Sequence, residues 1–237
     1  MNKVFIFDVD GTLTSSRQPM TDNFEIFFNG WSKRNSFYLV TGSDLAKTKE
    51  QVPEYLLERA DGIFTCCGNQ MWLNNELVYD NKFKPSDYLL KYLEDTLDEG
   101  DYPIKAGNHI EDRGSMLNFS MVGRKCTLQE RKNYFEYDRL TGEREEIANY
   151  IKSNWEDLDA VIGGQISIDI YPKGNDKSQI LKHIRDRNIV TSKDEYIFIG
   201  DGIENGGNDY PLAKLMDSLE GCSSYHTKGW EHTKEIL

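Results

Sequence analysis

The chain has 237 residues, of which 19 are glycine and 6 are proline, and its formal net charge is −12 at pH 7. This length suits one large domain or two small ones. The acidic balance disfavours a nucleic-acid partner, which usually needs a basic face. No apolar stretch is long enough to span a bilayer, and the first strand starts without a signal peptide, so we expect a cytoplasmic protein with no membrane partner.

The first apolar run, Val4 to Phe7, is followed by two acids, Asp8 and Asp10, and then by Gly11 and Thr12. A buried strand that ends in Asp-x-Asp-Gly-Thr places both acids at its carboxyl end, where open α/β sheets place their chemistry. Asp8 can attack phosphorus as a nucleophile, and Asp10 can protonate the leaving oxygen. Paired like charges are costly to bury, so we expect a cation between them. The alternative is a solvated acidic turn.

Helix and strand patterns then alternate. The predicted elements are a helix over 22–33, a strand over 37–40, a helix over 45–59 and a strand over 63–66. Ser43 and Asp44 lie between the second strand and its helix, and either can cap that helix. A strand, a small polar turn and a helix N-terminus form an anion-binding arrangement, so Ser43 can hold a phosphate oxygen. A plain helix cap is the alternative.

The pattern changes after the third strand. We predict a loop-rich stretch over 77–87, helices over 88–99, from 127 and over 143–155, a strand over 116–122 and a hairpin over 160–171 that turns at Gly163–Gly164. In the second arm of the hairpin, Ser167 and Asp169 share a polar face opposite an apolar one, which is typical of a sheet covered by helices on one side. We therefore expect residues 80–173 to form an inserted α/β cap domain.

The chain then returns to its first pattern. A return linker ends at Asp176, which can cap a helix over about 177–187, and a strand over 195–199 ends in Gly200-Asp201-Gly202. A helix over 211–219 and a strand over 222–225 complete the chain. Strands that alternate with helices predict a parallel sheet with right-handed crossovers. The expected fold is α/β, with a doubly wound, mostly parallel, Rossmann-like core over 1–79 and 174–237.

Phosphoryl transfer through an aspartate needs further groups beside Asp8 and Asp10. Lys177 can neutralise both a phosphate and Asp8, although a surface lysine is the alternative. Asp201 can hold Mg²⁺ together with Asp8, and Asp209 can be a further acidic ligand, although a lone Gly-Asp-Gly is only a turn.

Three arginines of the insert, Arg113, Arg124 and Arg131, have the guanidinium group that suits bidentate phosphate binding; three solvated arginines are the alternative. The segments that surround them, EDRGSMLNFSMVGRKCTLQER and IGGQISIDIYPKGNDK, resemble eukaryotic-type phosphomannomutases of the haloacid dehalogenase-like superfamily. The segments DVDGTLTSSRQ and GDGIENGGND resemble the same family. The resemblance extends over nearly the whole chain.

The resemblance implies a reaction and a set of site residues. Mannose 6-phosphate and mannose 1-phosphate are interconverted for GDP-mannose synthesis, and a sugar bisphosphate (glucose or mannose 1,6-bisphosphate) primes the aspartate. The implied catalytic residues are Asp8, Asp10, Ser43 and Lys177. The implied metal ligands are Asp8, the carbonyl of Asp10, and Asp201, with Asp209 as the further acid. The implied substrate-binding residues are Arg17, Arg113, Arg124, Arg131, Ser167 and Asp169.

The resemblance also implies homodimers that pair through their caps. Two other functions fit the same residues: a Mg²⁺-dependent sugar-phosphate phosphatase, and a catalytically idle sugar-phosphate-binding protein. The intact acids disfavour the idle protein, and the three cap arginines favour the mutase over the phosphatase. The segment 215–218 lacks the Asp-Pro pattern through which the family binds a further cation.

Overall fold

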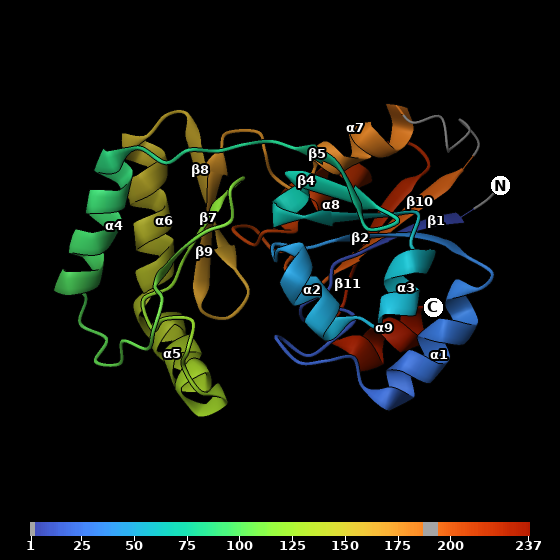
Figure 1. Ribbon diagram of the computed structural model, residues 1–237, viewed down its shortest axis with the longest axis horizontal. Coiled ribbons are helices and arrows are strands. Elements are labelled where there is room, and N and C mark those ends of the chain that lie inside the picture. Colours follow the sequence, from blue (N-terminus) through green and yellow to red (C-terminus); the bar gives the residue numbers. More distant parts are fainter. Residues whose placement is uncertain (1–2, 187–193) are drawn as a thin grey trace. The chain divides into compact units, whose positions relative to one another are not determined.

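The computed structural model of the chain describes residues 3–186 and 194–237 (Figure 1). The chain divides into two compact units. The first unit consists of Met1–Asp80 and Asn175–Leu237, and the second consists of Asn81–Gly174. Among the described residues, no helix has the length and apolar character needed to cross a membrane.

The described part of the first unit is built on a seven-stranded sheet with the order β11-β10-β1-β2-β3-β4-β5. The strands are β1 (Lys3–Phe7), β2 (Ser36–Val40), β3 (Gly62–Thr65), β4 (Gln70–Leu73), β5 (Glu76–Asp80), β10 (Glu195–Gly200) and β11 (Cys222–His226). The strands from β11 to β3 are parallel, and β4 and β5 add an antiparallel hairpin at one edge. This sheet confirms the expected, mostly parallel α/β core.

Helices cover both faces of this sheet (Figure 1). They are α1 (Asp22–Ser32), α2 (Leu45–Gln51), α3 (Glu54–Arg59), α7 (Gln179–Asp186), α8 (Tyr210–Asp217) and α9 (Trp230–Ile236), with a 3₁₀ turn η1 (Cys66–Gly68) after β3. Phe5 and Phe7 of β1 pack in one apolar cluster with α1, α3 and α9. Val4 and Ile6 pack in another with α7 and α8. Alternate side chains of β1 thus pack into the apolar clusters on opposite faces of the sheet, as expected for a doubly wound sheet.

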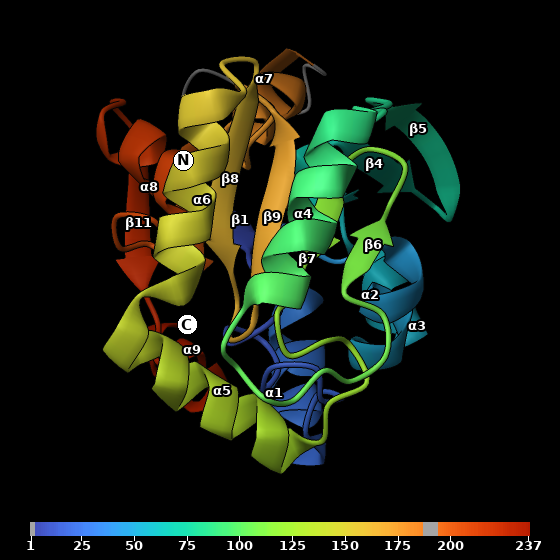
Figure 2. The same ribbon diagram turned by 90° about the vertical axis from the view of Figure 1, so that its left-hand side faces the viewer.

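The second unit has its own antiparallel sheet, with the order β6-β7-β9-β8. Its elements are α4 (Asp87–Glu99), β6 (Ile110–Asp112), β7 (Leu117–Phe119), α5 (Leu128–Thr141), α6 (Glu143–Asn154), β8 (Leu158–Gly163) and β9 (Ser167–Pro172). Helices α4 and α6 lie across one face of the sheet (Figure 2) and share its apolar cluster. The hairpin predicted at Gly163–Gly164 is confirmed by the pairing of Gly163 with Ser167.

The structure corrects several predicted elements. The single helix expected over 45–59 is two helices, because Pro53 has no N–H to donate and its predecessor Val52 is extended. Residues 77–80, expected in a loop, form β5, which pairs with β4 through a turn at Asn74 and Asn75, both with positive φ. The strand expected over 116–122 is the shorter β7, and β4, β6 and α9 were not predicted.

The end of the return linker also differs from the prediction. The helix expected from 177 starts at Gln179, and Asp176 Oδ1 accepts a hydrogen bond from the backbone N–H of Ser178 in the turn before it. The expected end of this helix at residue 187 lies outside the described residues.

Candidate active site

Three neighbouring parallel strands end at the same edge of the first unit's sheet. β1 lies between β10 and β2 and pairs in register with both. The residues that follow these strands therefore meet: Asp8 after β1, Thr41–Ser43 after β2 and Asp201 after β10. The backbone N–H of Asp8 extends the ladder by donating to the carbonyl of Ile199 at 3.0 Å. The carboxyl edge beside a central strand is where open α/β sheets form their binding crevice.

Lys177, in the turn before α7, is completely buried between two carboxylates. Its Nζ donates to Asp8 Oδ1 at 2.7 Å and to Asp209 Oδ1 at 2.6 Å. Burial alone lowers the pKa of a lysine, but the negative charges of Asp209 and Asp8 outweigh burial and hold the pKa of Lys177 well above its ordinary value. The alternative of a surface lysine is therefore wrong. Lys177 is a fixed cation that holds one oxygen of Asp8 in place.

A third carboxylate, that of Asp201, lies close to the two that contact Lys177. Oxygens of Asp8, Asp201 and Asp209 lie within 4.8 Å of one another. Burial raises the pKa of Asp8 well above its usual value, an effect that Lys177 opposes and the two neighbouring acids reinforce. Among the described residues, the buried Oδ2 of Asp8 accepts no hydrogen bond. An all-oxygen donor set with excess negative charge and an unpartnered buried oxygen fits a hard cation such as Mg²⁺.

The three acids are not equivalent as metal ligands. Asp209 is completely buried, its Oδ1 accepts from Lys177, and its Oδ2 accepts from the backbone N–H of Gly202 at 3.0 Å. Both of its oxygens are thus engaged by the protein. Asp8 Oδ2 and the carboxylate of Asp201 are the groups that can hold a cation, with Asp209 behind them.

The carboxyl group of Asp201 lies against Gly11. A Cβ atom placed on Gly11 would lie 2.2 Å from Asp201 Oδ2, and Gly11 has a φ of +85°, which favours glycine. Although Asp201 is exposed as a whole residue, loss of hydration at its carboxyl group and the negative charge of Asp209 raise its pKa to about 7. Gly11 of the Asp-x-Asp-Gly-Thr motif therefore leaves space for the carboxyl group of Asp201, which follows β10.

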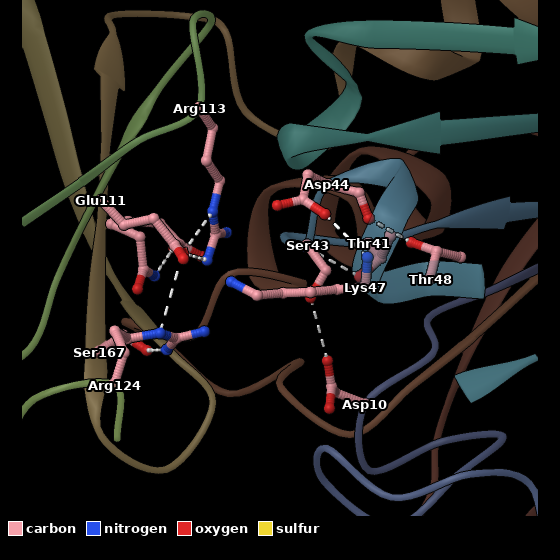
Figure 3. A network of polar contacts seen from close by, with 12 residues as sticks. Asp10, Thr41, Ser43, Asp44, Lys47, Thr48, Glu111, Arg113, Arg124 and Ser167 are labelled. Carbon is pink, nitrogen blue, oxygen red and sulfur yellow. Dashed lines mark hydrogen bonds and ion pairs between the residues drawn. The ribbon is translucent and has the colours of Figure 1, made fainter. Parts of the chain in front are cut away.

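Asp10 faces the turn after β2 (Figure 3). Its Oδ2 accepts from Ser43 Oγ at 3.4 Å, and its Oδ1 accepts from the backbone N–H of Arg17 at 2.7 Å. Nε2 of Gln51 also donates to Oδ1, at 3.0 Å. Asp44, rather than Ser43, caps α2 with its side chain. The hydroxyl of Ser43 is thus directed at the acid, and the alternative of Ser43 as a plain helix cap is wrong.

In the second unit, two of the predicted arginines converge on one carboxylate (Figure 3). Glu111 Oε2 lies 2.6 Å from Arg113 Nη2 and 3.8 Å from Arg124 Nε. Arg124 Nη1 also donates to Ser167 Oγ at 3.1 Å. Both arginine side chains are largely buried, so the alternative of solvated surface arginines is wrong for them. Their guanidinium groups are held in fixed directions.

The remaining predicted residues of the second unit have other partners. Arg131, in the first turn of α5 behind the capping box, is buried and donates from Nε to Gln165 Oε1 at 2.9 Å. Asp169 Oδ1 accepts from Asn118 Nδ2 at 2.7 Å. The structure thus brings Arg113, Arg124 and Ser167 together within this unit. The sixth predicted substrate residue, Arg17, belongs to the first unit.

Sequence reasoning missed four buried or half-buried polar residues that support these groups. Gln51 contacts Asp10, Glu111 pairs with two arginines, and Arg144 pairs with Asp138 at 2.8 Å. Arg144 Nη1 also donates to the carbonyl of Gly164 at 2.9 Å, which fixes the turn between β8 and β9. No local pattern marks these residues as a group, because several of the contacts join separate elements: Gln51 and Asp10 are 41 positions apart, and Arg144 and Gly164 are 20 positions apart.

Comparison with known proteins identifies the family. The family model described as eukaryotic phosphomannomutase matches residues 24–220. The chain belongs to the eukaryotic phosphomannomutase family. It is 38% identical over 226 residues to the phosphomannomutase of Encephalitozoon cuniculi, covering 90% of this chain and 85% of that protein. It is 33% identical over 244 residues to phosphomannomutase 1 of Dictyostelium discoideum, covering 97% and 95% respectively. The chain is therefore an isomerase that transfers phosphoryl groups.

Solved structures agree at the level of the fold. A haloacid dehalogenase-like hydrolase from Bacteroides thetaiotaomicron aligns over 100% of both chains, with a TM-score of 0.61 and 15% identity. An IMP-bound IMP-nucleotidase of Plasmodium falciparum aligns with a TM-score of 0.58 and 15% identity, and this chain spans 66% of that longer protein. These similarities confirm the expected haloacid dehalogenase-like fold of the phosphomannomutase family.

Proposed function

We propose that the protein interconverts mannose 6-phosphate and mannose 1-phosphate through a phosphorylated Asp8, and so supplies GDP-mannose synthesis. The observation that carries this proposal is the buried ammonium of Lys177 on Asp8 Oδ1, which leaves Asp8 Oδ2 without a hydrogen-bond donor. Such a carboxylate is oriented and desolvated, which suits a nucleophile that attacks phosphorus. A sugar bisphosphate, glucose or mannose 1,6-bisphosphate, primes the enzyme.

The proposed reaction has two steps, one that phosphorylates Asp8 and one that returns the phosphoryl group to a sugar. An oxygen of Asp8 forms a bond to phosphorus while the bond from phosphorus to the sugar oxygen breaks, and Asp10 gives its proton to that oxygen. In the second step a sugar hydroxyl attacks the phosphorylated Asp8, its proton goes to Asp10, and the bond from phosphorus to Asp8 breaks. Ser43 and Lys177 hold the oxygens of the phosphoryl group.

We propose Mg²⁺ as the resident cation, held by Asp8, Asp201 and the backbone carbonyl of Asp10. When bound, it neutralises charge on the phosphoryl oxygens and on Asp8. Asp209 contributes by fixing Lys177 and the backbone of Gly202, because both of its oxygens are already engaged.

A mutase must bind a sugar that carries phosphate at either end. We assign the second phosphate to Arg113, Arg124 and Arg131 of the second unit, because guanidinium groups bind phosphate in a bidentate way. Ser167 and Asp169 would then recognise sugar hydroxyls. The sugar turns over between the two steps, so that each phosphate in turn reaches Asp8.

Phosphorus NMR of the enzyme with mannose 1-phosphate, Mg²⁺ and a trace of bisphosphate tests this function. A mutase yields mannose 6-phosphate, whereas the runner-up, a sugar-phosphate phosphatase, yields inorganic phosphate and is not stimulated by bisphosphate. Asp8→Asn should lower turnover by orders of magnitude, whereas exposed Asp98→Asn should not. If free phosphate is the main product of the wild-type protein, the mutase proposal is wrong and the protein is a sugar-phosphate phosphatase.

Loss of an arginine that we assign to the second phosphate also distinguishes a mutase from a phosphatase. Arg131→Ala should weaken monophosphate and bisphosphate binding roughly ten- to a hundred-fold, because charge-assisted hydrogen bonds are lost. The ratio of phosphate released to sugar phosphate isomerised should rise. Arg139→Ala, an exposed residue of the same helix, is the matched control.

We also propose a cytoplasmic homodimer that pairs through the second unit. Sedimentation that finds only a species of 27.4 kDa at micromolar concentration would exclude the dimer.

A further inference from the structure

We propose that Gln51 is a positioning residue for Asp10, and that its amide selects Oδ2 of Asp10 as the oxygen that exchanges the proton with the sugar. This inference rests on the proposed acid–base role of Asp10. Gln51 is a buried polar residue, 6% exposed, at the end of α2.

The amide of Gln51 is held from several sides. Its Nε2 donates to Asp10 Oδ1 at 3.0 Å and to Thr14 Oγ1 at 3.1 Å, so the amide joins both ends of the loop that follows β1. Its backbone carbonyl accepts from the N–H of Met20 at 2.8 Å. The helix stops directly after it, because Val52 is extended and Pro53 follows. The position of the amide is therefore fixed by the end of α2 and by the loop itself.

The two oxygens of Asp10 have different surroundings. Oδ1 receives two donors, the side chain of Gln51 and the backbone N–H of Arg17 at 2.7 Å. Oδ2 receives the longer contact from Ser43 Oγ at 3.4 Å. A carboxylate with one oxygen doubly hydrogen-bonded is held against rotation, and its other oxygen remains the one that can take or give a proton.

An amide suits this task better than a charged donor. A lysine or arginine at residue 51 would also bond to Oδ1, but its positive charge would stabilise the anionic form of Asp10. A general acid and base must exist in both forms during the cycle. A neutral donor orients the group and adds no charge to the site.

Isomerisation kinetics of Gln51→Met test the proposal, because methionine keeps the length of the side chain and removes the donor. We expect kcat to fall roughly ten- to a hundred-fold, as for a lost hydrogen bond to a charged group, with KM nearly unchanged. Gln51→Glu, also equal in length, should be at least as slow because its carboxylate repels Asp10. Exposed Gln129→Met is the control. Thermal unfolding and circular dichroism identify any variant that fails to fold.

A double-mutant cycle separates this inference from the proposed function. In an Asp10→Asn background, Gln51→Met should cause little further loss, since both residues act through one group. If Asp10→Asn alone is active, the proposed role of Asp10 is wrong. If Asp10→Asn is inactive but folded Gln51→Met or Gln51→Glu turns over like wild type, or if the losses multiply, Gln51 does not position Asp10.

Discussion

A single buried lysine sets the charge balance of the candidate active site. Lys177 contacts Asp8 and Asp209, and Asp201 adds a third carboxylate to the same group. Loss of hydration, and then the negative charge of Asp209, raise the pKa of Asp201 to about 7. One ammonium cannot neutralise three carboxylates, so the site without a cation resists full ionisation. Protons and a divalent cation therefore compete for Asp201.

This competition predicts how stability depends on pH. Between about pH 4 and about pH 7 the folded protein keeps a proton on Asp201 that the unfolded chain releases, so the free energy of unfolding of the cation-free protein should fall as pH rises. Mg²⁺ should offset this fall. Urea unfolding with a chelator at about pH 5 and about pH 8 measures the slope. Asp201→Asn should make this slope shallower, with a remainder from Asp8, whose pKa is also raised, and Asp98→Asn should leave the slope unchanged. An equal slope in both variants would contradict the assignment.

The contact between Gly11 and Asp201 gives a second prediction. Gly11→Ala adds a Cβ that collides with Asp201 Oδ2, at 2.2 Å, in addition to the strain of a positive φ. Gly142→Ala is a matched control, because Gly142 has a φ of +73° with no atom within 4 Å of its added Cβ. Both variants should lose roughly 1 kcal/mol or more from backbone strain.

The collision should distinguish the two variants. Only Gly11→Ala should displace the carboxylate of Asp201 and raise the Mg²⁺ concentration needed for activity. If both variants need the same Mg²⁺ concentration for activity, Gly11 is required only for the backbone conformation of the turn and not for the position of Asp201.

At the scale of elements, helix α9 supports the loop that carries Asp8 and Asp10. Thr233 of α9 is completely buried, and its Oγ1 donates to the carbonyl of Thr12 at 2.8 Å and contacts Thr227 Oγ1 at 2.9 Å. A buried carbonyl that loses its donor costs about 1–3 kcal/mol. Helix α9 therefore holds the Asp-x-Asp-Gly-Thr loop from a point far away in the sequence.

Thr233→Val keeps the shape of the side chain and removes this hydrogen bond. We expect the free energy of unfolding to fall by about 1–3 kcal/mol and kcat to fall as well, because Thr12 lies two residues from Asp10. Exposed Thr141→Val serves as the control. Stability and activity indistinguishable from wild type would mean that α9 only covers the core. Urea unfolding and isomerisation assays give the two readouts.

The elements that the sequence predicted carry strong local signals. The apolar run before Asp8 and the capping box at Thr127 both have the predicted structure. The hairpin of β4 and β5 was missed because β5 is largely exposed and lacks an alternating burial pattern. Within the candidate site, the acids Asp8 and Asp10 could be predicted from a sequence motif. The contact of Gln51 with Asp10 could not, because it joins residues 41 positions apart and depends on tertiary structure.

At the scale of the whole molecule, the second unit is a continuous insertion with a core of its own. Residues 81–174 contain a complete antiparallel sheet and an apolar cluster drawn entirely from this segment. The first unit is instead made of two distant segments, whose β1 and β10 pair with each other. Only the second unit can therefore be separated without cutting its own core.

We expect the fragment 81–174 to fold alone and to bind mannose 6-phosphate weakly through its arginines. Dispersed amide signals in its NMR spectrum would report folding, and titration would report binding. Arg131→Ala in the fragment should weaken that binding roughly ten- to a hundred-fold, and Arg139→Ala should leave it unchanged. The partners of Arg124 and Arg131 described above, which are Glu111, Ser167 and Gln165, lie within the fragment. A folded fragment whose spectrum does not respond to sugar phosphate would therefore contradict the assignment of the second phosphate to these arginines.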